Sequence, residues 1–157
     1  MNLQAGLAAS QRVFMVMDLE PEIKDAPDAK ELTVSGGNIN FKNVSFAYNP
    51  EITALRDIDL DIKAGETVAL VGPSGAGKST ILNLIPRFYD IDNGAITVDG
   101  QDIRDLTLES LRRATALVSQ EITLFDDTVR ANIAYGRSGA TETEIEEAAR
   151  NAAAHDF

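Results

Sequence analysis

The sequence contains no cysteine, so disulfide bonds and thiolate metal sites are excluded. Basic residues are scarce: 14 lysines and arginines stand against 25 aspartates and glutamates, and the formal net charge is −11. A general nucleic-acid binder usually presents a basic face, so this balance argues against that class. No apolar run approaches the about 20 residues that cross a bilayer, and the N-terminus lacks the basic region and apolar core of a signal peptide. Any membrane association is therefore expected through a partner or through sequence outside these residues.

The most informative stretch that is present is a glycine-rich loop of the phosphate-binding pattern G-x-x-x-x-G-K-[ST]. Its glycines let the backbone turn N–H groups toward phosphate oxygens. Lys78 can carry positive charge to the outer phosphates, and the Ser79 hydroxyl can ligate Mg²⁺. The pattern predicts a nucleoside triphosphate with magnesium as the ligand. The predicted binding residues are Gly72, Pro73, Ser74, Gly75, Ala76, Gly77, Lys78, Ser79 and Thr80.

The segments on both sides of the loop support this interpretation. Residues 66–71 form a short β-branched apolar run that is typical of a buried strand. After the loop, apolar side chains recur at helical spacing, at Ile81, Leu84, Ile85 and Phe88. A helix that begins at the loop would place unpaired N–H groups and its positive dipole end beside an anion.

The chain of 157 residues, 44% of them hydrophobic, is long enough for one domain with a buried core. Residues 1–20 carry an imperfect apolar stripe that predicts a helix, which Pro21 ends. Residues 21–38 contain prolines, acidic residues and Gly36-Gly37, and are expected to form a linker. The compact domain is expected over residues 39–157.

Within that domain, a β-rich front part is expected to precede an α/β core that starts at the loop, and helices come last. Apolar alternation in residues 39–48 shifts by one after Phe41, which predicts a β-bulge. Asp99-Gly100 is typical of a hairpin turn, and Thr141 with Glu144 forms a capping box. The expected strands are 39–48, 55–62, 66–71, 94–98 and 116–120, and the expected helices are 106–113, 128–135 and 141–154.

Two residues outside the loop narrow the ligand. Tyr48 ends a predicted strand, where its ring can stack on adenine; the alternative is an ordinary strand-end aromatic. Gln120 ends the second buried strand. Ligands of open α/β sheets lie at the carboxyl ends of strands, so its amide can reach Mg²⁺ and the attacking water. The alternative is a surface amide.

These residues together give the chain a clear resemblance to the nucleotide-binding domain of ATP-binding cassette (ABC) exporters, closest to lipid and multidrug exporters of the lipid A flippase kind. The resemblance covers essentially the whole chain. It implies an α/β fold with a P-loop NTPase core, an antiparallel β-subdomain before it and a partial helical subdomain at the C-terminus. The matching stretches besides the loop are residues 44–48, 54–58, 94–100, 118–121 and 124–133.

The resemblance implies a role for each site residue. Tyr48 is the aromatic on adenine, and Lys78 is a catalytic residue on the β- and γ-phosphates. Ser79 and Gln120 are the magnesium ligands, and Gln120 is also a catalytic residue that couples the site to the membrane domain. ATP and Mg²⁺ are the implied cofactors. The aromatic residues Phe88, Tyr89 and Phe125 would line the groove for a coupling helix, although such residues more often belong to a core.

The same resemblance implies partners and a location. A transmembrane domain of the same transporter, in which residues 1–20 are the cytosolic end of the last helix, and a second nucleotide-binding domain are expected. The site would lie on the cytosolic face of the inner (plasma) membrane, and the parent protein would export a lipid or hydrophobic substrate. No nucleic-acid partner is expected.

The residues after Gln120 do not supply four features of the family pattern. These are the Leu-Ser-Gly-Gly-Gln signature, the second magnesium carboxylate, the catalytic glutamate and the switch histidine. His155 is expected to be a surface or packing residue. Two apolar runs that end in aspartate, residues 14–18 and 96–99, are interpreted as a helix and a hairpin end. We therefore expect this chain to bind ATP and not to hydrolyse it.

Two other classes stay open from the sequence. The chain could be a stand-alone nucleotide-binding module without turnover. It could also be another P-loop NTPase, such as a small kinase or a chromosome-maintenance ATPase, but these lack the leading strand that carries Tyr48.

Overall fold

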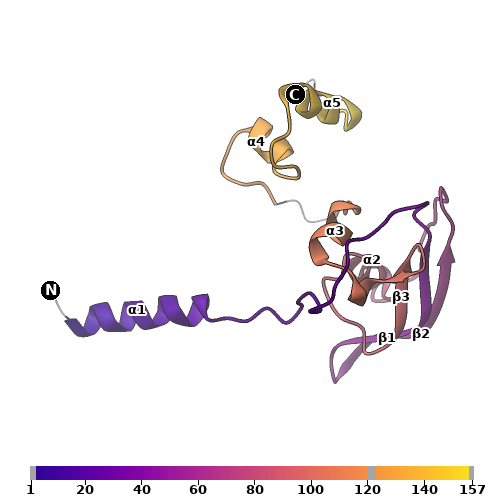
Figure 1. Cartoon of the computed structure of the whole chain (residues 1–157), viewed down its shortest axis with the longest axis horizontal. Helices are drawn as coiled ribbons and strands as arrows, with labels where there is room; N and C mark the ends of the chain where they lie inside the picture. Colours follow the sequence, from indigo (N-terminus) through magenta and orange to yellow (C-terminus); the bar gives the residue numbers. More distant parts are fainter. Residues whose placement is uncertain (1–2, 120–122, 156–157) are drawn as a thin grey trace. The chain divides into compact units, whose positions relative to one another are not determined.

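The structure, a computed structural model, describes residues 3–119 and 123–155 (Figure 1). It contains a four-stranded antiparallel sheet with the strand order β2-β1-β3-β4. The long strands β1 (Ile39–Asn49) and β2 (Ile52–Ile62) form a hairpin. The strand β3 (Asn93–Val98) pairs with the other edge of β1, and the short β4 (Gln101–Asp102) pairs with β3. The predicted α/β class is confirmed, with an antiparallel sheet beside several helices.

The bulge predicted in the first strand is confirmed. Phe41 faces Leu60, but the next pair joins Val44 to Ile58, so β1 contains one more residue than β2 in this interval. Asn43, inside the interval, has a positive φ of 50°. The extra residue restores alternation, and Phe41 and Val44 both point into the core.

The turn between β3 and β4 is the predicted two-residue hairpin. Val98 pairs with Gln101, and both residues between them have positive φ, 49° at Asp99 and 77° at Gly100. These are the angles of a type I′ turn, whose twist matches that of the strands.

The core lies between the sheet and the helices that follow it. The helix α2 (Lys78–Leu84) begins in the glycine-rich loop, and Leu84 on it is fully buried. The 3₁₀ turn η1 (Ile103–Asp105) and the helix α3 (Leu108–Arg113) complete this part. The buried core residues are Phe41, Val44, Phe46, Leu55, Leu84, Ile96, Val98, Ile103, Leu106 and Leu111.

Helix α2 ends earlier than the apolar spacing predicts. The spacing extends to Phe88, whereas the helix ends at Leu84 and Arg87 has a positive φ of 53°. Pro86 explains the difference, because it has no N–H to donate to the preceding turn. The chain then turns back through Arg87.

Residues 118–157 form a separate compact unit. It contains α4 (Val129–Ala134) and α5 (Glu142–Asn151), both shorter than predicted. The capping box of α5 is confirmed: the Thr141 hydroxyl accepts from the Glu144 N–H, and the Glu144 carboxylate accepts from the Thr141 N–H. Ile145 and Ala149 form the buried face of α5.

Two predicted strands are absent from the described part of the chain. Residues 66–72 and 115–119 lie outside any helix or strand, and Val71 and Val118 are 89% and 96% exposed. A parallel strand takes its hydrogen bonds from neighbouring strands, and an apolar run cannot supply them by itself. No described strand pairs with either segment, so the strand predictions for 66–71 and 116–120 are wrong for this structure as far as it is described.

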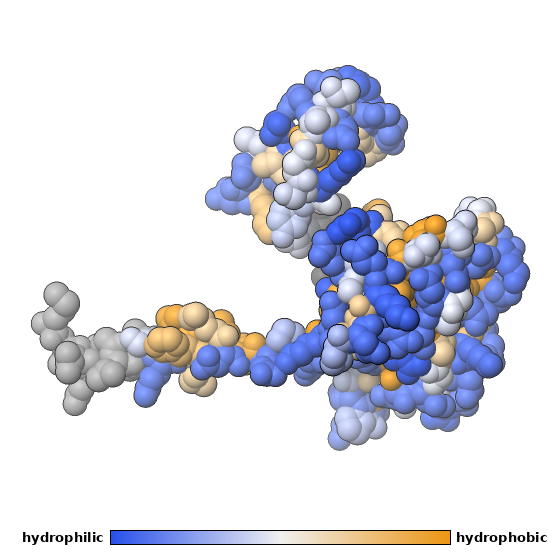
Figure 2. Space-filling model, viewed as in Figure 1, coloured by the Kyte–Doolittle hydropathy of each residue, from blue (hydrophilic) through white to orange (hydrophobic). Residues whose placement is uncertain are grey.

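The predicted N-terminal helix is confirmed as α1 (Leu3–Met17), which ends three residues before the expected boundary. Figure 2 shows hydrophobic residues on its surface, and its last turns expose Val13, Phe14, Met15, Val16 and Met17. No helix among the described residues is long and apolar enough to span a membrane. The apolar run with Asp18 is thus helical, as expected, through Met17.

Residues 25–38, here called the strap, contain no helix or strand but are held against the segment 99–110. The Lys30 N–H donates to the Asp105 carbonyl, and the Thr107 N–H donates to the Lys30 carbonyl. The side-chain amide of Gln101 pairs with both backbone groups of Thr33. The expected linker sequence is therefore fixed along much of its length, through polar contacts that composition does not reveal.

Candidate functional site

The glycine-rich loop folds back on itself before α2 begins. The Ala76 N–H donates to the Pro73 carbonyl at 3.3 Å, and the Ile81 N–H donates to the Gly77 carbonyl at 3.0 Å. Gly75 and Gly77 have φ of 79° and 81°, in the left-handed region that favours glycine. The residues of the pattern thus form the tight turn that their sequence predicts.

Lys78 bends its side chain back over this turn. Its Nζ donates hydrogen bonds to the carbonyl oxygens of Gly72, at 2.9 Å, and Pro73, at 2.7 Å. The ammonium is a compact charge with three donors, so it brings positive charge to the mouth of the loop. This position fits a residue that binds the outer phosphates of a nucleotide.

Tyr48 lies beside the loop, although it comes from β1. Its hydroxyl is 3.1 Å from the Thr80 hydroxyl on α2. Thr80 is 5% exposed, whereas Tyr48 is 45% exposed. The structure therefore brings the predicted adenine-stacking ring and the predicted phosphate cradle together and leaves much of the ring accessible.

Gly77 is required by packing as well as by its φ. A Cβ on this residue would lie 2.6 Å from Leu55 Cδ2 and 2.8 Å from the Ala54 carbonyl oxygen. Leu55 belongs to β2 and to the core. The end of the loop thus packs directly on the sheet, and this close contact fixes its position against β2.

The loop has two features that suit a bound nucleotide: free space beside its backbone and an oxygen atom that can ligate a metal ion. A Cβ on Gly75 would meet nothing within 4 Å, so the backbone there can approach a phosphate closely. Ser79 is exposed and offers a hydroxyl oxygen, a donor that suits Mg²⁺. Among the described residues no group of three or more His, Cys, Asp or Glu could hold a metal. Gln120, the other predicted magnesium ligand, lies outside the described residues.

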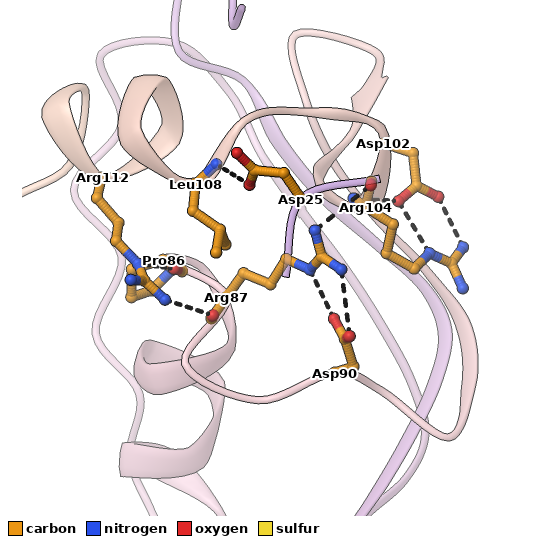
Figure 3. A network of polar contacts seen from close by, with 8 residues as sticks. All are labelled: Asp25, Pro86, Arg87, Asp90, Asp102, Arg104, Leu108 and Arg112. Atoms are coloured by element: carbon orange, nitrogen blue, oxygen red, sulfur yellow. Dashed lines mark hydrogen bonds and ion pairs between the residues drawn. The ribbon is translucent and has the colours of Figure 1, made fainter. Parts of the chain in front are cut away.

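A polar network fixes the turn that follows α2 (Figure 3). The Arg87 guanidinium is bound by the Asp90 carboxylate, with Nε–Oδ1 at 2.6 Å, and also donates to the Arg104 carbonyl at 3.4 Å. Arg112 on α3 donates to the carbonyls of Pro86 and Arg87 at 3.1 and 3.0 Å. Arg87 is 6% exposed, so this is a buried charge with a partner. Sequence reasoning missed this residue; the close Arg87–Asp90 spacing was its only signal.

The three predicted groove aromatics have different surroundings. Phe88, 43% exposed, lies under the Arg112 guanidinium at 5.3 Å. Tyr89 contacts the rings of Phe46 and Tyr48. Phe125 belongs to the separate unit and packs on Tyr135 at 4.3 Å. Their role as a coupling groove stays a prediction.

Asp99 lies in the β3–β4 hairpin turn, and its carboxylate is hydrogen-bonded to the backbone of the strap. Its carboxylate accepts hydrogen bonds from the backbone N–H groups of four strap residues, at 2.7 to 3.0 Å; these are Ser35, Gly36, Gly37 and Asn38. The bonds from Gly36, Gly37, Ser35 and Asn38 hold the pKa of Asp99 well below its usual range. The charged carboxylate thus anchors the strap to the β3–β4 turn.

The family profile described as ABC transporter matches residues 55–157. The chain is 55% identical to an ATP-dependent lipid A-core flippase of Syntrophus aciditrophicus and 53% identical to the flippase of that name from Escherichia coli K12, in each case over 99% of the chain. It is 51% identical, over 99% of its length, to the mitochondrial iron-sulfur clusters transporter atm1 of Neurospora crassa.

A solved structure, that of a bacterial Atm1-family ABC exporter with ATP bound, superposes with a TM-score of 0.89 at 45% identity. The match covers 98% of this chain and 27% of that one. The chain spans about a quarter of the length of these curated relatives: 26% of the Syntrophus flippase, 27% of the Escherichia coli flippase and 22% of the Neurospora transporter.

Proposed function

This chain belongs to the ABC transporter family, and we propose that it is the ATP-binding portion of an ABC exporter. The observation that carries the proposal is the contact between Tyr48 and the loop: Tyr48 of β1 has an accessible ring, and its hydroxyl is 3.1 Å from the hydroxyl of Thr80, two residues beyond Lys78. A ring that can stack on a base and a loop that can bind phosphates, lying side by side, suit a single nucleoside triphosphate.

In the proposed site each residue has one task. Tyr48 stacks on adenine, residues 72–80 surround the phosphates, and Lys78 neutralises the β- and γ-phosphates. Each contact between a charged donor and phosphate is stronger than a neutral hydrogen bond. Phosphoryl transfer depends mainly on such positioning and charge neutralisation.

Mg²⁺ would be held by the Ser79 hydroxyl and by Gln120, together with phosphate oxygens. Magnesium usually keeps few protein ligands and binds through the substrate's phosphates, which agrees with a loop that offers the exposed Ser79 hydroxyl. When bound, it would polarise the phosphate oxygens. The chain by itself is proposed to bind ATP without turnover.

The remaining assignments follow from the family. Residues 1–20 would be the cytosolic end of a transmembrane-domain helix, 21–38 a linker, and 39–157 the N-terminal part of the nucleotide-binding domain. The partners would be that transmembrane domain and a second nucleotide-binding domain, on the cytosolic face of the inner membrane. Flippases for lipid A-core among the relatives support a lipid or hydrophobic export substrate.

The test is binding of ATP with Mg²⁺ to the full chain, measured by equilibrium dialysis, in wild type and Lys78→Ala. We expect the wild type to bind and Lys78→Ala to bind about 10- to 100-fold more weakly, because a charged hydrogen-bond donor to phosphate is lost. Lys42→Ala, which removes an exposed lysine of β1, is the matched control and should bind as the wild type does. Equal affinity in all three proteins would refute the proposed site. Release of phosphate from ATP by the chain would refute the absence of turnover.

A further inference from the structure

Three aromatic rings meet at the adenine side of the proposed site. Phe46 and Tyr48 come from β1, and Tyr89 comes from the turn that follows α2. The ring centroids of Phe46 and Tyr48 are 4.9 Å apart, those of Tyr48 and Tyr89 are 5.2 Å apart, and those of Phe46 and Tyr89 are 5.5 Å apart. All three separations lie in the range of favourable aromatic pairs.

Tyr48 is restrained from several sides by this cluster. It is nearly perpendicular to both neighbouring rings, at 80° to Phe46 and 89° to Tyr89. Its hydroxyl is bonded to Thr80. These contacts leave 45% of Tyr48 exposed, so the ring is held in one orientation and stays accessible.

Tyr89 is itself on a fixed piece of backbone. The Phe88 N–H before it donates to the Asn83 carbonyl of α2 at 3.2 Å. Asp90 after it is bound by Arg87 through Nε–Oδ1 at 2.6 Å. Both neighbours of Tyr89 are thus held, and the ring itself packs between Phe46 and Tyr48, so it can support the Tyr48 ring.

We propose that Tyr89 is a positioning residue for nucleotide binding, which holds the Tyr48 ring in the orientation that accepts the adenine base. The inference rests on the proposed function and adds to it a second ring that does not need to touch the nucleotide. A binding ring that is oriented beforehand loses less freedom when the base stacks on it, so the complex is tighter.

The exposure of Tyr89 argues against a purely structural role. Tyr89 is 41% exposed, whereas the core side chain Leu84 on the same segment is fully buried. If the Tyr89 side chain only filled the core, its replacement would weaken binding of the phosphates and of the base alike. If the side chain orients the Tyr48 ring, its replacement should weaken binding of the base and leave binding of the phosphates unchanged.

The experiment therefore separates base from phosphate. Dissociation constants for ATP and for inorganic tripolyphosphate, both with Mg²⁺, are measured by calorimetry on the full chain. We expect Tyr89→Leu to weaken ATP binding about two- to tenfold, the range of one lost aromatic pair, and to leave tripolyphosphate binding unchanged. Tyr89→Phe keeps the ring and should bind both ligands as the wild type does.

Tyr135→Leu is the matched control, because it removes an exposed tyrosine from the separate unit and should change neither constant. Thermal unfolding checks that each variant is folded. If Tyr89→Leu does not fold, Tyr89→Met, which keeps a long apolar side chain against Phe46, is expected to give the same split.

The outcomes distinguish the two proposals. A wild type that binds neither ligand would overturn the proposed function and this inference with it. A wild type that binds ATP, with ringless variants at position 89 that bind ATP equally well or lose both ligands in equal measure, would overturn the inference alone.

Discussion

Two glycines of the phosphate loop differ in what surrounds them, although both have the same backbone conformation. Gly75 has φ of 79° and faces open space, while Gly77 has φ of 81° and packs on Ala54 and Leu55 of β2. At Gly75 only conformational freedom matters. At Gly77 there is, in addition, no room for a side chain.

Adding one methyl group at each of these glycines tests this difference. Gly75→Ala should lower the free energy of unfolding by about 1 kcal/mol, the penalty of a Cβ in the left-handed region. Gly77→Ala should lower it by about 1–3 kcal/mol more, because the new Cβ overpacks against a backbone carbonyl. Urea unfolding followed by circular dichroism measures both. Equal effects of the two substitutions would contradict the close packing of the loop on β2.

The β3–β4 turn and the strap show how two elements depend on one carboxylate. A two-residue turn projects Asp99 toward consecutive N–H groups of residues 35–38. The same strap is held by Gln101 at Thr33 and by Ser110, whose hydroxyl accepts from the Leu32 N–H at 2.9 Å. Apart from the backbone bridge of Lys30 to the segment 105–107, these contacts hold the strap through side-chain partners.

Asp99→Asn should release the end of the strap, because an amide offers one acceptor oxygen without charge to the N–H groups that now surround a carboxylate. We expect the amide resonances of residues 35–38 to move toward unstructured positions in NMR spectra. Asp61→Asn, which removes a β2 carboxylate that pairs with Lys63, is the control and should leave these amides in place.

The Asp99 carboxylate should also make the stability of the protein depend on pH. The pKa of Asp99 is lower in the folded chain than its ordinary value of 3.8, so its stabilisation is present above that value and is lost as the pH falls below it. Wild type should therefore lose thermal stability between about pH 4 and pH 2 more steeply than Asp99→Asn does. Parallel pH profiles of the two proteins would contradict the anchoring role of the charged carboxylate.

At the scale of the larger unit, residues 1–117, one buried arginine joins segments that are distant in sequence. Arg87 pairs with Asp90 in its own turn and donates to the Arg104 carbonyl after β4, and Arg112 of α3 donates to its carbonyl (Figure 3). Leu108 at the start of α3 donates its N–H to Asp25 of the strap at 2.8 Å. The turn after α2, α3 and the strap are thus linked through neighbouring polar contacts.

Removing this arginine should destabilise the whole unit. Arg87→Met keeps much of the aliphatic stem but leaves Asp90 without its cation, and we expect about 2–3 kcal/mol of lost stability. This is below the range for a fully buried pair, because Asp90 is 41% exposed. Arg104→Met removes an arginine that is 42% exposed and pairs locally with Asp102, and should lower stability by under about 1 kcal/mol. Urea unfolding compares the two, and a smaller effect of Arg87→Met would contradict this view of the network.

Elements set by local rules could be predicted, and those set by distant partners could not. The bulge after Phe41, the Asp99-Gly100 turn and the capping box at Thr141 follow from side-chain periodicity, positive φ and a nearby hydroxyl, which a few neighbouring residues decide. The early end of α2 was also local, since Pro86 is visible in the sequence. The buried Arg87 network and the fixed strap depend on groups that only the fold brings together.

The strand predictions at residues 66–71 and 116–120 fail for a related reason. A β-branched apolar run has the propensity for a strand, but its hydrogen bonds must come from another segment. Val71 remains exposed in this structure, so propensity alone did not order the run into a sheet.

The sequence by itself predicted the ligand class, because the phosphate-loop pattern needs specific residues at adjacent positions and Gly72 to Thr80 match it. It also indicated the family, which the match over residues 55–157 shows. Only the tertiary structure decided that Tyr48 lies one hydrogen bond from Thr80 and that the Tyr89 ring contacts its ring. These contacts join β1 to α2 and to the turn beyond it, and the folding of the chain around a common core, which no local pattern encodes, sets their distances.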